Sequence, residues 1–89
     1  MKDLIIIGAS GHGREVLDII ERINDVKPTY NILGFVDDNE AIQGHSINGI
    51  KVLGGLSYLK EFLLNRKIFV VIAIANADIK RKISSELEG

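Results

Sequence analysis

The 89-residue sequence contains no cysteine, no tryptophan and a single proline. Without cysteine the chain has no disulfide, no thiolate nucleophile and no thiolate metal site, which suits a reducing compartment and leads us to expect a cytoplasmic protein. One proline, 46% hydrophobic residues and 26% charged residues argue against disorder or low complexity. We therefore expect one compact domain over residues 1–89, of a size that buries only about 60 to 65% of its unfolded surface.

An excess of charge of one sign is also missing. The 11 Lys and Arg residues and 12 Asp and Glu residues give a net charge of −1, so no global field attracts nucleic acid or an anionic membrane. The apolar run near the N-terminus, Leu4 to Ile7, is too short for a signal-peptide core or a membrane span. We expect neither a nucleic-acid partner nor a membrane partner.

What the sequence does contain is a series of short apolar runs, which predict buried strands. Runs without polar alternation are typical of strands covered on both faces in parallel sheets, and they occur at residues 4–7, 32–36 and 68–74. A short further strand, the third along the chain, is predicted at residues 51–53. Asn48-Gly49 is a tight-turn signal before it. We expect residues 39–50 to form a polar connection.

Three helices are predicted between and after these strands. The first is indicated by apolar residues at helical spacing, namely Val16, Ile19, Ile20 and Ile23. The second is expected over about 57–65, with the inward residues Leu59, Phe62 and Leu63. The third has an apolar stripe made of Ile79, Ile83 and Leu87. Asn76 or Asp78 is expected to cap this last helix.

Strands that alternate with helices predict an α/β fold with right-handed crossovers. We expect a half-Rossmann-like, three-layer fold around a four-stranded parallel sheet in the order 3-2-1-4. In open sheets of this kind, ligands bind outside the carboxyl ends of the strands. Residues that directly follow the predicted strands are therefore the candidates for a site.

The stretch IIIGASGHGREVLDII (residues 5–20) leads from a strand through three glycines into a helix. The first N–H groups of a helix lack intrahelical partners and the helix dipole is positive there, so a phosphate fits. Gly8, Gly11 and Gly13 let the backbone approach such a group closely. Against the G-x-G-x-x-G spacing of dinucleotide-binding turns, Ser10 stands at the middle glycine and adds a hydroxyl donor. The alternative is that the glycines only let strand and helix pack closely.

Two acidic residues, Asp37 and Asp38, follow the second predicted strand. At this position Rossmann enzymes use an acid to bind ribose hydroxyls, and a carboxylate also accepts from a base N–H. The alternative is that Asp37 ends the strand and Asp38 caps a turn. No third ligand is tied to the pair by spacing, so we expect no metal site.

Three further residues are candidates for the same edge of the sheet. His12 lies inside the glycine turn, where its imidazole or its N–H can face an anion; the alternative is a surface histidine without a role. Asn76 follows the fourth strand, and Arg81 lies one turn into the next helix, within reach of a phosphate. The alternative for the basic residues 80–82 is a solvated face. No acid or nucleophile is identified beside His12, so we expect no catalytic residue, and His45 is interpreted as a loop residue.

In combination, four stretches resemble a known family: IIIGASGHGREVLDII, ILGFVDDNE, GIKVLGG and FVVIAIANADIKRKI. They are similar to the N-terminal domain of the bacterial sugar O- and N-acyltransferases. This family is typified by sialic acid O-acetyltransferase and by the pilin-glycosylation acetyltransferases that act on UDP-4-amino sugars. The resemblance runs from Met1 to about Leu87, and the combination of G-H-G-R-E with G-F-V-D-D is its most specific part.

The resemblance implies a half-Rossmann domain that binds a UDP-sugar. It places the pyrophosphate at Gly11, His12 and Gly13 and the uridine near Asp37 and Asp38, with Gly54 and Gly55 bordering the same cleft. It also implies a C-terminal left-handed β-helix that trimerises, binds acetyl-CoA and supplies the catalytic histidine. That β-helix is absent from this chain, so the chain alone is not expected to be catalytic, and it needs no cofactor of its own.

We therefore expect a nucleotide-sugar-binding domain of an acetyl-CoA-dependent sugar acetyltransferase in glycan biosynthesis. Its candidate substrate-binding residues are Gly8, Ser10, Gly11, His12, Gly13, Asp37, Asp38, Asn76 and Arg81. Two alternatives stay open, a minimal NAD-binding module and a non-catalytic interaction domain. Ser10, the long spacing from Gly13 to Asp37 and the lack of a second βαβ half argue against NAD.

Overall fold

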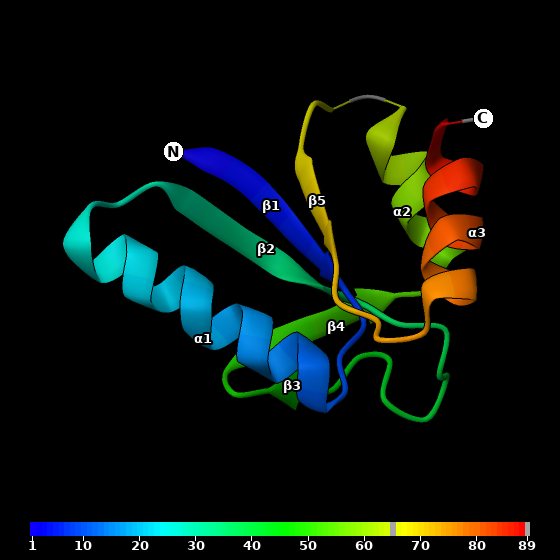
Figure 1. Cartoon of the computed structure of the whole chain (residues 1–89), viewed down its shortest axis with the longest axis horizontal. Helices are drawn as coiled ribbons and strands as arrows, with labels where there is room; N and C mark the ends of the chain where they lie inside the picture. Colours follow the sequence, from blue (N-terminus) through cyan, green and yellow to red (C-terminus); the bar gives the residue numbers. More distant parts are fainter. Residues whose placement is uncertain (65, 89) are drawn as a thin grey trace.

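The computed structural model describes residues 1–64 and 66–88. Strands and helices follow one another as β1 (Lys2–Ile7), α1 (Gly11–Val26), β2 (Tyr30–Val36), β3 (Ser46–Ile47), β4 (Ile50–Gly54), α2 (Leu56–Leu63), β5 (Phe69–Ile72) and α3 (Ala77–Glu88). In Figure 1, α1 lies on one side of the sheet, and α2 and α3 lie together on the other. The predicted α/β fold with three layers is confirmed. Position 65, at the end of the predicted second helix, and position 89, at the end of the predicted domain, lie outside the described residues.

The sheet has the strand order β3-β4-β2-β1-β5. β1 is parallel to both β2 and β5, and β2 is parallel to β4. The four predicted strands correspond to β1, β2, β4 and β5, so their predicted order 3-2-1-4 is the observed β4-β2-β1-β5. Each crossover between them contains a helix or a long connection, as parallel pairing requires.

The fifth strand, β3, was not predicted. It pairs antiparallel with β4 through a hairpin whose turn is Asn48-Gly49. Both turn residues have positive φ, 51° and 82°, as a two-residue hairpin turn of type I′ requires. The turn prediction is therefore confirmed, while the prediction that residues 39–50 form only a polar connection was wrong at β3 and at Ile50, the first residue of β4. A two-residue strand has no periodicity of its own, and only its ladder with β4 defines it.

The core lies on both faces of β1, the central strand. Leu4 and Ile6 pack toward α1, whereas Ile5 and Ile7 pack toward α2 and α3. All four side chains are at most 3% exposed. Because successive side chains of a strand point to opposite faces, an uninterrupted apolar run is what a strand between two helical layers needs.

The predicted inward stripe of the first helix is only partly observed. In α1 the buried apolar residues are Leu17 and Ile20, and Val16 is partly buried. Ile19 and Ile23, which were predicted to face inward, are 56% and 42% exposed. The reason is that Ile19 and Ile23 line an open groove between α1 and β5, which no described segment fills. None of the described helices combines the length and apolar character needed to cross a membrane.

Two glycines of the turn determine how closely α1 approaches β1. Gly13 is buried, and a Cβ there would overlap the carbonyl oxygen of Gly8. Gly8 itself has φ +101°, and a Cβ there would come within 2.7 Å of the Ala73 carbonyl oxygen. In contrast, a Cβ at Gly11 would meet no atom within 4 Å. Close packing therefore explains Gly8 and Gly13 but not Gly11.

This contrast gives a matched pair of substitutions. Gly13→Ala should lower the free energy of unfolding by about 1–3 kcal/mol, because the new methyl group forces α1 away from the Gly8 carbonyl. Gly11→Ala, in the same helical turn, should leave it unchanged or raise it by up to about 1 kcal/mol. Urea unfolding followed by circular dichroism measures both. Equal stability of the two variants would contradict the packing role of Gly13.

Candidate functional site

A cavity of about 190 Å³ opens at the carboxyl ends of β1 and β2, with room for about six water molecules at about 30 Å³ each. Its lining comprises Ile7, Gly8, Ser10, Val36, Asp37, Asp38, Leu56, Ile74, Ile79 and Ile83. These residues come from the ends of β1 and β2, the start of α2, the segment after β5, and α3. The cavity therefore lies at the edge where open α/β sheets bind ligands.

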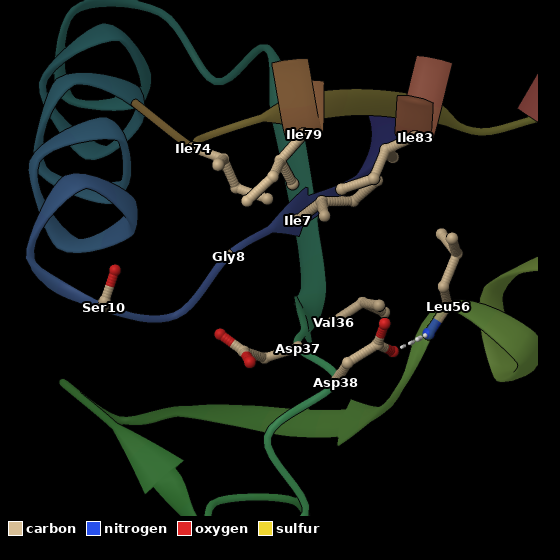
Figure 2. A pocket seen from close by; sticks show the side chains of 10 residues that line it. All are labelled: Ile7, Gly8, Ser10, Val36, Asp37, Asp38, Leu56, Ile74, Ile79 and Ile83. Carbon is tan, nitrogen blue, oxygen red and sulfur yellow. Dashed lines mark hydrogen bonds between the residues drawn. The ribbon is translucent and has the colours of Figure 1, made fainter. Parts of the chain in front are cut away.

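The two sides of this cavity differ in polarity. Figure 2 shows Ile7, Ile74, Ile79 and Ile83 gathered on one side and the two carboxylates on the other, with Ser10 on the glycine loop nearby. An apolar wall can hold a planar ring or an apolar part of a ligand, and carboxylates accept hydrogen bonds from N–H or hydroxyl groups. The arrangement suits a ligand with one flat apolar face and donors along its edge.

Asp37 joins the glycine loop to the end of β2. Its Oδ2 accepts a hydrogen bond from the Ala9 N–H at 3.0 Å, and its Oδ1 accepts one from the Asn39 N–H at 2.9 Å. The Gly8 N–H also donates to the Val36 carbonyl at 2.8 Å. An ionised carboxylate offers about four acceptor positions, so Asp37 can accept from a ligand as well. The strand-ending role and the binding role proposed for Asp37 are therefore compatible.

Asp38 anchors the start of α2. Its Oδ1 accepts a hydrogen bond from the Leu56 N–H at 2.8 Å, drawn as a dashed line in Figure 2. A Cβ at Gly55, the N-cap of α2, would come within 2.6 Å of this oxygen. Gly55 is thus beside Asp38, although neither Gly54 nor Gly55 lines the cavity. Oδ2 of Asp38 has no hydrogen-bond partner within the described part of the chain.

The N-terminus of α1 follows Ser10, which lines the cavity. Ser10 is the N-cap residue, yet its hydroxyl does not cap the helix, and no acidic residue lies in the first turn. The hydroxyl and the first N–H groups of α1 are therefore free to meet an anion. Gly11, His12 and Gly13 follow directly but do not line the cavity. The half-exposed His12 has its Nδ1 3.6 Å from Glu15 Oε2.

Asn76 and Arg81 have structural partners away from the cavity. Oδ1 of Asn76 accepts hydrogen bonds from the N–H groups of Asp78 and Ile79, at 2.9 and 3.1 Å, so the predicted cap of the last helix is confirmed for Asn76. Arg81 pairs with Asp78 on the exposed side of α3. Neither residue lines the cavity, and the arrangement of Arg81 is that of a solvated helix face.

The structure thus brings four of the nine candidates to the cavity: Gly8, Ser10, Asp37 and Asp38. Sequence reasoning missed the apolar side of the site, above all Ile79 and Ile83, which it described only as part of the apolar stripe of the last helix. Their i, i+4 spacing is the same for a core contact and for a cavity wall, so no sequence signal separates the two. Among the described residues no group of three or more His, Asp or Glu residues is placed to hold a metal ion.

Comparison with protein-family models matches residues 3–87 to the PglD N-terminal domain. Two solved structures of the acetyltransferase domain of PglB from Neisseria gonorrhoeae FA1090 are also similar. The one in complex with acetyl coenzyme A is 29% identical over 98% of this chain, with a TM-score of 0.74. The other is 30% identical over 99% of this chain, with a TM-score of 0.72. This chain spans 38% and 40% of those chains. A search of curated proteins found no match.

The role of Asp37 in holding the glycine loop can be measured without a ligand. Asp37→Ala should lower the free energy of unfolding by about 1–3 kcal/mol, because the N–H of the buried Ala9 loses its acceptor. The control is Asp25→Ala on the exposed surface of α1, which should change the stability by less than about 0.5 kcal/mol. Urea unfolding of both variants is the measurement. A loss no larger for Asp37→Ala than for the control would refute the anchoring role.

Proposed function

The chain belongs to the PglD N-terminal domain family, and from this premise we propose that residues 1–89 form the nucleotide-sugar-binding domain of a cytoplasmic sugar acetyltransferase in glycan biosynthesis. The observation that carries the proposal is the cavity at the carboxyl ends of β1 and β2, which lies next to an α1 N-terminus without a side-chain cap. Phosphates suit a helix N-terminus, and the remainder of a nucleotide suits a half-apolar cavity with acceptors.

The pyrophosphate of a UDP-sugar lies, in this proposal, against the first turn of α1. The Ser10 hydroxyl and the N–H groups of Gly11, His12 and Gly13 are the donors. Gly11 supports this assignment, because no neighbouring atom in the structure explains the absence of a side chain there. A bound phosphate does explain it, since a Cβ at this position would stand between the ligand and the backbone.

The uridine lies deeper, between the isoleucine wall and the two carboxylates. Uracil is planar, so one face can pack against Ile79 and Ile83, while its N–H and the ribose hydroxyls can donate to Asp37 and Asp38. Asp38 Oδ2 is the acceptor that no described residue uses. The cavity volume of about 190 Å³ accommodates part of a nucleotide, so the sugar extends outward along the strand ends.

Acetyl transfer itself is assigned to a part of the enzyme outside this chain. The similar PglB structure contains acetyl coenzyme A, and this chain spans 38% of it. We propose that acetyl-CoA is the co-substrate of the whole enzyme, bound by a trimeric β-helix domain that supplies the catalytic histidine. The role of this chain is then to bind the nucleotide sugar and to present its sugar group for transfer.

The first test of this function is a calorimetric titration with UDP, a UDP-sugar and NAD. We expect the uridine ligands to bind and NAD to bind at least tenfold more weakly. Gly11→Val should abolish uridine binding while the fold persists, because the new side chain occupies only open space in the protein. Circular dichroism checks the fold of the variant. Tight NAD binding would favour the dinucleotide alternative, and no binding of any nucleotide would remove the proposed function.

A second substitution tests the base and ribose side of the site. Asp38→Asn keeps an oxygen for the Leu56 N–H but replaces the other acceptor with an NH₂ donor. UDP affinity should fall about tenfold or more, as expected for a lost charge-assisted hydrogen bond of about 1.5–3 kcal/mol. Asp25→Asn, on the exposed surface of α1, is the matched control and should bind UDP like the wild-type protein. Unchanged affinity of Asp38→Asn would exclude Asp38 as a ligand acceptor.

A further inference from the structure

The strand β5, which has four residues, is an edge strand that lacks the charge, the proline and the bulge by which edges are usually protected. It stands at the end of the sheet, next to β1. Residues 68–74 read IFVVIAI, with no charge and no proline. Edge strands usually carry lysine, proline or a bulge, or are very short, because an unpaired edge recruits another strand. The opposite edge, β3, follows this rule with only two residues, so the contrast concerns β5 specifically.

The free edge of β5 presents unpaired backbone groups at two residues. The Ala73 N–H donates to the Ile7 carbonyl at 2.8 Å, so the backbone groups of Ala73 and Val71 point toward β1. Because the direction alternates along a strand, the N–H and carbonyl groups of Val70 and Ile72 point outward. These groups have no hydrogen-bond partner among the described residues. The edge therefore offers two donors and two acceptors.

The side of β5 that faces α1 continues into an apolar groove. Its volume is about 300 Å³, and it is lined by Leu4, Val16, Ile19, Ile20, Ile23, Tyr30, Phe69, Val70 and Val71. Phe69 is 53% exposed, and Ile19 is the exposed residue of α1 noted above. Figure 1 shows α1 running alongside β2 and away from β5. A strand added to the edge of β5 would extend the sheet beside this groove and cover part of it.

We propose that two copies of this chain associate through the β5 edges, antiparallel about a two-fold axis at Val71. Val70 of one copy then pairs with Ile72 of the other, and Ile72 with Val70. Both are hydrogen-bonded pairs, which gives four intermolecular hydrogen bonds. Val71 faces its symmetry mate as a non-hydrogen-bonded pair, and its own backbone groups remain bonded to β1. In this register, each outward-facing residue of β5 pairs with an outward-facing residue of the other copy.

A second copy suits this edge because the pattern is self-complementary. Residues at equal distances from Val71 provide matching donors and acceptors, as a two-fold interface requires. Neither β5 strand carries a charged side chain, and the nearby Lys2 ammonium lies over the Phe69 ring, 5.3 Å from its centroid. In a complete doubly wound sheet of order 3-2-1-4-5-6, the strand at the position of β5 is internal and paired on both sides. In the proposed dimer the second copy pairs with the edge of β5 that no described strand occupies.

The first experiment measures the mass of the 89-residue chain by sedimentation equilibrium over a concentration series. We expect the mass to rise from 9.8 kDa toward twice that value. Phe69→Lys should shift the dissociation constant upward by tenfold or more, because it places a charge on the edge and in the groove. Val26→Lys is the control, since Val26 is 90% exposed at the end of α1 and outside the groove, and it should associate like the wild-type protein.

The second experiment tests the register and uses the absence of natural cysteine. Val71→Cys places two sulfur atoms across the axis in a non-hydrogen-bonded pair with Cα atoms about 4.5 Å apart, within the range of a disulfide. Mild oxidation should therefore give a covalent dimer. Val70→Cys, the same change one residue earlier, lies diagonally from its symmetry mate at about 7–8 Å and should not cross-link efficiently.

Each experiment can overturn the proposal. A monomer at all concentrations, with no cross-linking of Val71→Cys, would exclude association through β5. Association that Val26→Lys weakens as much as Phe69→Lys would assign it to the apolar surface of α1 instead. Cross-linking of Val70→Cys as readily as Val71→Cys would refute the register centred on Val71. Circular dichroism of each variant confirms that a loss of association is not a loss of folding.

Discussion

The close approach of Gly13 to the carbonyl of Gly8 is the constraint on which the rest of the structure depends. It lets α1 begin three residues after Gly8 and lie directly against the end of β1. The N-terminus of α1 is thereby held at the edge where the strands end. The hydrogen bond from the Ala9 N–H to Asp37 fixes the same loop from the other side. The first contact lies within the glycine turn and the second joins residues 28 apart in the chain, and together they determine where an anion can meet the helix.

The polar residues of the site also support the fold. Asp37 holds the glycine loop and Asp38 caps α2, whereas Asn76, which caps α3, lies outside the cavity lining. The glycine loop and α2, which both contribute lining residues, are thus anchored by side chains of the cavity itself. Because a carboxylate has more acceptor positions than these contacts use, anchoring leaves capacity for a ligand. Such groups are held in place before a ligand arrives, which lowers the entropic cost of binding.

A half-sized sheet leaves apolar surface that a larger sheet would cover. β1 is covered by helices on both faces, but β5 has one neighbouring strand among the described residues, and an open groove lies between it and α1. The exposure of Ile19 and Ile23 and the unprotected edge of β5 are two consequences of this geometry. The same geometry leaves the carboxyl ends of the strands accessible. The free edge of β5 and the cavity at the ends of β1 and β2 therefore have the same structural cause.

The sequence by itself determined every described strand and helix except β3, the order of the four parallel strands and the tight turn at Asn48-Gly49, and it limited the cap of the last helix to Asn76 or Asp78. These features depend on periodicity and turn chemistry over a few neighbouring residues, or on the handedness of crossovers, which is the same in nearly all proteins. It also identified the residues that follow the strands, and four of them line the cavity. Their contact with a nucleotide sugar stays a prediction.

Only the tertiary structure decided that packing requires Gly8 and Gly13 but not Gly11. It likewise decided which face of α1 is buried and that Ile79 and Ile83 form a cavity wall. It also decided that Asp38 caps a helix that begins 18 residues later. Each of these depends on segments far apart in the chain, whose distances are fixed only when the layers pack. A pattern of residue types indicates how residues are spaced along one helix or strand, but not how far that element lies from the next. The geometry of the site depends on the distances between elements.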